Sequence, residues 1–108
     1  MNFTDVAKRF EHRISCTDSF KIFYKEVFEL MRSDIENAGL YFVVGVMARS
    51  FVVTYEDRDL TADFVDCVKA RLVAMNDKLI RAMAEDPTTR LRLLGEVATE
   101  YEWQVTSF

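Results

Sequence analysis

Two apolar stripes, one on each side of Asp86-Pro87, constrain the fold of this 108-residue chain more than any other feature. The first consists of Val65, Val68, Leu72, Met75, Leu79 and Ala82, and the second of Leu91, Leu94, Ala98, Tyr101 and Val105. Their spacing, alternately three and four residues, places each set along one side of an α-helix. Two such helices joined by a short turn bury their stripes against each other, so the sequence predicts an antiparallel hairpin over residues 61–105.

The ends of these two helices carry residues that favour helix starts. Thr61 can cap the first helix, and Asp63 lies in its first turn, where a carboxylate interacts favourably with the helix dipole. Asp86 can cap the second helix, because Pro87 behind it fits the first helical position, which needs no amide donor. From Tyr101 onward apolar and polar residues alternate with a period of two, so an extended segment over 101–106 is an alternative there.

The N-terminal half predicts two further helices. A short one begins near Thr4 or Asn2 and buries Phe3, Val6, Ala7, Phe10 and Ile14. A longer one runs over residues 18–37. The residues Asn37-Ala38-Gly39 are its expected stop, because Gly39 can adopt the left-handed conformation at a helix end.

Residues 40–55 are rich in β-branched and aromatic residues, which favour strands. Two strands in 41–55 would need a turn at Ala48-Arg49-Ser50, and these residues supply no tight-turn chemistry. We therefore expect a central helix surrounded by others, with Gly45 marking the close approach of a neighbouring helix, as Gly95 does in the last helix. Arg49 interrupts this apolar segment. We expect it to form a buried ion pair or to contact an anion, because an unpaired interior charge is costly.

The fold prediction is thus all-α: a single domain over residues 1–108, with four main helices and a short N-terminal one. The alternative is an α+β fold with strands in 41–55 and 101–106. The longest run without a charged residue, 38–48, has 11 residues, whereas a membrane span needs about 20. No signal peptide is visible at the N-terminus, so we expect a soluble cytoplasmic protein, of microbial origin and without a membrane partner.

The residue inventory argues against an enzyme with its own active site. His12 is the only histidine, so the two Glu-x-x-His pairs of a two-iron bundle cannot be formed. Glycine occurs only at 39, 45 and 95, which excludes a phosphate-binding loop. Cys16 and Cys67 are 51 positions apart and lack metal-ligand spacing. We expect no catalytic residue, no metal site and no cofactor.

Aromatic residues are numerous for such a short chain, with nine Phe, four Tyr and one Trp. A small helical protein has too much surface to hide all of them, so we expect a face that binds a partner protein or a second copy of the chain. The expected function is therefore a non-catalytic interaction module that regulates, inhibits or chaperones another protein. The candidate contact residues are the aromatic Tyr101, Trp103 and Phe108 and the basic Arg81, Arg90 and Arg92.

Two alternatives follow from other features. The net charge is −4, but residues 67–92 carry six basic and three acidic residues. This basic region, 69–92, is where an accessory subunit would contact nucleic acid. A bundle that holds a small ligand between helices near Gly45 and Met47 is the other alternative.

Overall fold

The computed structural model describes residues 1–104, and within this range the chain is helical, with no strand. In chain order its elements are α1 (Phe3–His12), α2 (Thr17–Ser33), η1 (Ile35–Asn37, a 3₁₀ turn), α3 (Ala38–Tyr55), α4 (Ala62–Met83) and α5 (Pro87–Gln104). The all-α prediction is confirmed. The segments of the α+β alternative, 41–55 and the described part of 101–106, are helical instead.

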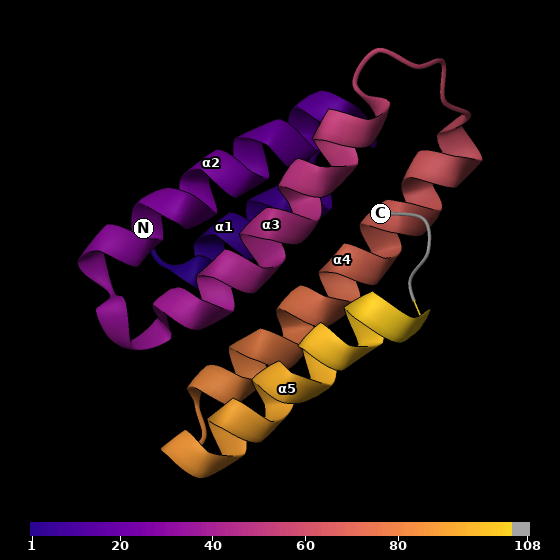
Figure 1. Ribbon diagram of the computed structural model, residues 1–108. Coiled ribbons are helices and arrows are strands. Elements are labelled where there is room, and N and C mark those ends of the chain that lie inside the picture. Colours follow the sequence, from indigo (N-terminus) through magenta and orange to yellow (C-terminus); the bar gives the residue numbers. More distant parts are fainter. Residues whose placement is uncertain (105–108) are drawn as a thin grey trace.

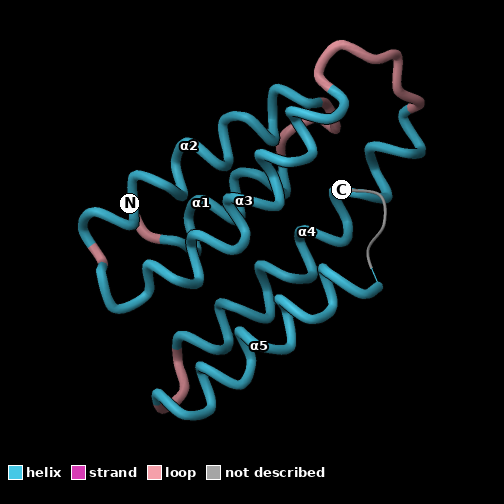
Figure 2. The backbone as a smooth tube through the Cα atoms, viewed as in Figure 1, coloured by secondary structure: helices cyan, strands magenta, loops and turns pink. Residues whose placement is uncertain are grey.

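The helices form the layered arrangement seen in Figure 1, and Figure 2 shows that only short loops separate them. α2 packs most extensively against α3, and α1 lies behind this pair, against α2 and α4. α4 contacts α1 and α3, whereas α5 packs mainly on α4 and touches α3 less. α3 therefore lies between α2 and the α4–α5 hairpin.

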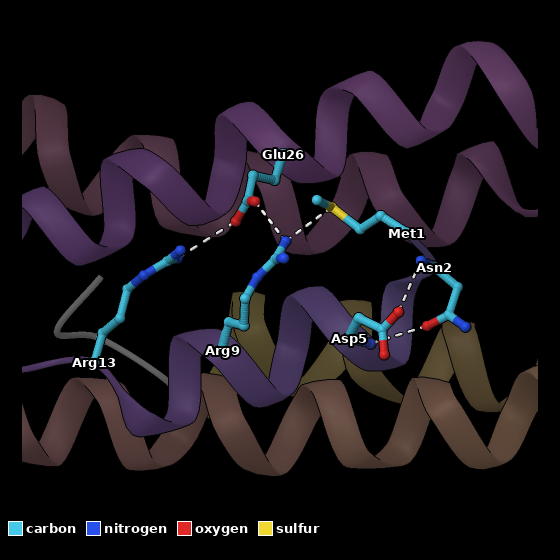
Figure 3. Close-up of polar contacts among 6 residues, drawn as sticks. All are labelled: Met1, Asn2, Asp5, Arg9, Arg13 and Glu26. Atoms are coloured by element: carbon cyan, nitrogen blue, oxygen red, sulfur yellow. Dashed lines mark hydrogen bonds and ion pairs between the residues drawn. The ribbon is translucent and has the colours of Figure 1, made fainter.

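Polar residues fix the helix ends and the position of α1. Asn2 forms a capping box with Asp5, and the Glu26 carboxylate of α2 accepts hydrogen bonds from Arg9 at 2.6 Å and Arg13 at 3.3 Å (Figure 3). Of the two caps considered for the first helix, Asn2 is the one used. The later caps form as predicted: Thr61 accepts from the Phe64 amide, and Asp86 accepts from the Thr89 amide.

The two stripes of the predicted hairpin differ in how far they are buried. All six stripe residues of α4 are buried. In α5 the fully buried residue is Val97, which was not predicted, while Leu91 is 70% exposed and Ala98 is exposed. Leu94 and Tyr101 are half-buried, and Val105 lies outside the described residues. The prediction was wrong for Leu91 and Ala98 because α5 lies at the edge of the bundle, where only the side turned toward α4 is covered.

One glycine contact determines how closely α2 and α3 approach. A Cβ atom added at Gly45 would lie 2.3 Å from Cε1 of Phe28, so the aromatic ring occupies the space that any other side chain would need. The expected close approach at Gly45 is confirmed. At Gly95 a Cβ atom would meet nothing within 4 Å, so the same expectation was wrong there.

We predict that Leu72→Ala lowers the free energy of unfolding by about 2–5 kcal/mol, because the Leu72 side chain is fully buried and its removal leaves a cavity in the core. The matched control is Leu91→Ala in the neighbouring helix, which should change stability by less than about 0.5 kcal/mol, because that side chain is largely in water. Urea unfolding followed by circular dichroism measures both. Equal losses in the two variants would contradict the burial pattern described here.

We also predict a sign change in a double-mutant cycle between Gly45 and Phe28. Gly45→Ala should destabilise the protein, because the new methyl group collides with the ring. In a Phe28→Ala background the same change should stabilise it by roughly 0.5–1 kcal/mol, the helix-propensity gain of alanine over glycine. Thermal unfolding of the four proteins supplies the cycle. Additive effects would mean that the ring does not fill this space.

Candidate functional site

The outer face of α3 carries an apolar stripe that the neighbouring helices leave uncovered. Its residues, spaced 3-4-3-4, are Gly39, Phe42, Val46, Arg49 and Val53, and we call them the α3 stripe. Phe42 is 50% exposed and Val53 is 77% exposed, and Val46 is half-buried. The opposite side of α3 is buried, with Leu40, Val44, Met47 and Phe51 in the core. α3 is thus a core helix on one side and an apolar surface on the other.

Aromatic rings of α2 extend this surface. Phe28 lies between Tyr24, with ring centroids 5.8 Å apart, and Phe42, at 6.5 Å. The Arg49 guanidinium lies over the Phe28 ring, 5.1 Å from its centroid. The apolar surface therefore spans the boundary between α2 and α3 and has one positive charge near its middle.

The prediction that Arg49 forms a buried ion pair was wrong. The side chain is exposed, and among residues 1–104 it forms no ion pair. The physical reason is that α3 is not enclosed on this side, so the guanidinium stays in water and packs on an aromatic ring. An anion contact by Arg49 stays a prediction.

A pocket of about 350 Å³ opens at the N-terminal end of the α3 stripe, between η1–α3 and the start of α5. Its lining consists of Glu36, Gly39, Leu40, Pro87, Arg90, Leu91 and Leu94. Leu91, the exposed member of the predicted α5 stripe, thus borders the same side of the molecule as Gly39. The apolar surface continues from α3 toward the first turn of α5.

The basic residues predicted to bind a partner are mostly engaged within the chain. Arg90 donates hydrogen bonds to the side chain of Asn37, at 3.3 Å, and to backbone carbonyls at the end of α4, so it ties three elements together. Lys78 and Arg92 both pair with Glu96, at 2.8 and 2.5 Å, and these contacts, that of Lys78 above all, hold the pKa of the Glu96 carboxyl below its ordinary value. Arg81 is exposed on α4.

The two described members of the predicted aromatic contact set, Tyr101 and Trp103, differ in exposure. Trp103 is 80% exposed near the end of α5, whereas Tyr101 is half-buried and packs against the core. Phe108 lies outside the described residues. Sequence analysis missed the α3 stripe because residues 40–55 were expected to be enclosed on all sides. The 3-4-3-4 spacing of residues 39–53 was present in the sequence, but stronger apolar residues on the buried side masked it.

Beside the pocket, a polar corner joins η1 to α3. The Tyr41 hydroxyl donates a 2.5 Å hydrogen bond to the Asp34 carboxylate, which also accepts from the Asn37 amide at 3.0 Å. The hydrogen bond from Tyr41 and then that from Asn37 lower the pKa of Asp34, while burial, followed by the Asp34 contact, raises the pKa of the Tyr41 hydroxyl. This corner holds the start of α3 in place.

The lowered pKa of Asp34 predicts a loss of stability in acid. A carboxyl whose pKa is depressed by folding stabilises the native state above its unfolded pKa, near 3.8, and this contribution disappears as the pH falls through the folded value. Asp34→Asn should therefore lose less stability than the wild type between about pH 5 and about pH 2. Urea unfolding across this range measures the difference. Asp57→Asn, in the exposed α3–α4 loop, is the control, and a wild-type-like acid profile for Asp34→Asn would contradict the assignment.

Two further observations concern possible metal ligands and the apolar composition of α3. Among residues 1–104, His, Cys, Asp and Glu side chains form no group of three that could hold a metal ion. The segment Ile35–Tyr55 is long and apolar enough to cross a membrane by length and composition, with a mean hydropathy of 1.5, and 44% of its apolar window is buried in the bundle. The unburied part of this helix includes the α3 stripe.

Comparison of the chain with protein-family models, with curated proteins and with solved structures finds no match in any of the three.

Proposed function

We propose that the protein is a non-catalytic module that binds another protein and regulates, inhibits or chaperones it. The observation that supports this proposal is the α3 stripe, where Phe42 and Val53 stay in water although the opposite side of α3 is packed in the core. Contiguous exposed apolar surface of this kind is typical of protein-binding faces. Aromatic residues at its edge, Phe28 and Phe42, are of the type that anchors interfaces.

The contacts of the basic region argue against the nucleic-acid alternative. Lys69 donates to the backbone carbonyl of Arg13, Lys78 and Arg92 pair with Glu96, and Arg90 hydrogen-bonds to α4 and η1. Four of the six basic side chains of residues 67–92 are therefore already engaged. Phosphate binding needs cations that face solvent together, which this arrangement does not favour.

The packing near Gly45 argues against the small-ligand alternative. The Phe28 ring fills the space above Gly45, and Met47 is only 1% exposed in a continuous apolar core. A ligand between these helices would have to displace side chains that already fill this part of the core. A protein partner on the outer surface requires no such rearrangement. We place the protein, with this role, in a microbial cytoplasm.

Affinity capture from a lysate of the source organism tests the proposal. The wild-type protein and Ile14→Asp should enrich the same partner, whereas Val53→Asp should lose it, because a charge is introduced into the exposed apolar stripe. Ile14→Asp is the matched control, since Ile14, in the α1–α2 loop, is 78% exposed and Val53, in α3, is 77% exposed. Mass spectrometry with quantified stoichiometry is the measurement, and equal melting temperatures show that both variants fold.

A third variant separates the site from the function. If the partner is retained by Val53→Asp and lost by Trp103→Ala, the protein is a binding module that uses the end of α5. If the wild-type protein enriches no protein over an untagged control, the proposed function is overturned.

A further inference from the structure

We propose that the α3 stripe is the docking site for an amphipathic helix of a partner protein, and that this helix carries a carboxylate opposite Arg49. This inference rests on the proposed function, since it names the kind of partner that the binding surface takes. It is carried by the shape of the stripe and by the charges around it.

The shape of the stripe fits a helix. The interval of three and then four residues is the spacing with which one helix packs along another in a coiled coil. Along the stripe the residues alternate between small and large: Gly39, Phe42, Val46, Arg49 and Val53. Small residues leave holes and large residues form knobs, so a facing helix can interdigitate over roughly 21 Å, the length of 14 helical steps.

The charges around the stripe are positive on the side of α2. Lys25 and Arg32 are both exposed and lie three residues before and four residues after Phe28, on the same edge of α2. Arg32 has a weak contact with Glu29, at 3.9 Å between two exposed side chains. Arg49 lies over the Phe28 ring, and helical spacing places Lys25 and Arg32 before and after Phe28 along α2, in a chain whose net charge is −4.

Arg49 determines which charge the docked helix must carry. Within the described residues it has an aromatic ring beneath it and no carboxylate beside it. A helix that covers the stripe would remove this guanidinium from water, and a buried charge without a partner is strongly unfavourable. The covering helix must therefore supply an acidic residue, and Lys25 and Arg32 favour further acidic residues at its edge.

The same features disfavour two other occupants. A second copy docked through its own α3 stripe would bring Arg49 again, and the stripe contains no carboxylate to place against it. A lipid bilayer favours large apolar side chains that protrude, whereas Gly39, Val46 and Val53 are short and the charge lies in the middle of the stripe. Neither occupant uses the alternation of small and large residues.

Two synthetic 21-residue helical peptides test the proposal. Both have leucine at the first and fourth positions of each heptad and identical alanine and glutamate residues elsewhere. They differ only at the central contact position, which is glutamate in one and lysine in the other. Fluorescence anisotropy with labelled peptides should show that the wild-type protein binds the glutamate peptide roughly tenfold more tightly, as a close charge pair predicts.

Charge reversal gives the decisive comparison. Arg49→Glu should invert the preference, so that the lysine peptide binds more tightly, because the partner charge is now complementary. Lys8→Glu, a control at an exposed position on α1, should leave the preference as in the wild type. Both substitutions are at exposed positions, and circular dichroism shows that each variant is folded.

Three outcomes would overturn the proposal. The first is equal binding, or absence of binding, of the two peptides to the wild type. The second is binding to vesicles of phosphatidylcholine and phosphatidylserine that Phe42→Ser abolishes, without discrimination between the peptides, which would assign the stripe to a membrane surface. The third is a dimer in sedimentation equilibrium that Val53→Asp dissociates and neither peptide displaces. If the peptides fail while lysate capture still yields a partner that depends on Trp103, the proposed function stands and only this site falls.

Discussion

The constraint on which the structure depends is that five helices of this length cannot enclose one of their own members. α3 is apolar on nearly every side, and its neighbours α2, α4 and α5 cover only one part of its circumference. The surface of a domain of this size is large relative to its volume, so one side of the central helix must remain in water. One side of α3 therefore packs against the other helices in the core. The other side forms the exposed apolar surface that is the candidate binding site.

The sequence pattern predicted the positions of the helices well. It predicted less well which side of each helix faces the core. The stripe of α4 was predicted completely because that helix has neighbours on both sides: Lys69 reaches the carbonyl of Arg13, directly after α1, and Lys78 pairs with Glu96 of α5. The stripe of α5 was predicted only in part, because Leu91 and Val97 both belong to plausible apolar faces. The choice between them depends on which side has a neighbour, and this is a property of the tertiary packing rather than of the helix.

Charged residues show the same limit of local information. The basic region of residues 69–92 suggested a surface for an acidic partner, yet four of its six basic side chains find partners within the chain. The partners of Lys69 and Arg90, Arg13 and Asn37, lie far away in sequence. Arg49 shows the reverse case. It was expected to be buried and paired because the residues around it are apolar, and it is exposed because that part of α3 has no neighbour. Sequence patterns report the composition around a charge, whereas its environment is decided by helices that pack from elsewhere.

Gly45, Phe28 and Arg49 act as one structural unit. The missing side chain at Gly45 lets the Phe28 ring lie against α3, and the ring in turn supports the Arg49 guanidinium at 5.1 Å. A charge held in this way loses less conformational freedom on binding than an arginine that moves freely in solvent, so less of the interaction energy is offset by ordering. The contact that brings α2 and α3 together therefore also fixes the position of the one charge in the α3 stripe. Since the ring lies beneath the guanidinium, the outward side of the guanidinium stays open. In the proposed complex, the core packing would therefore set where the acidic residue of the docked helix lies.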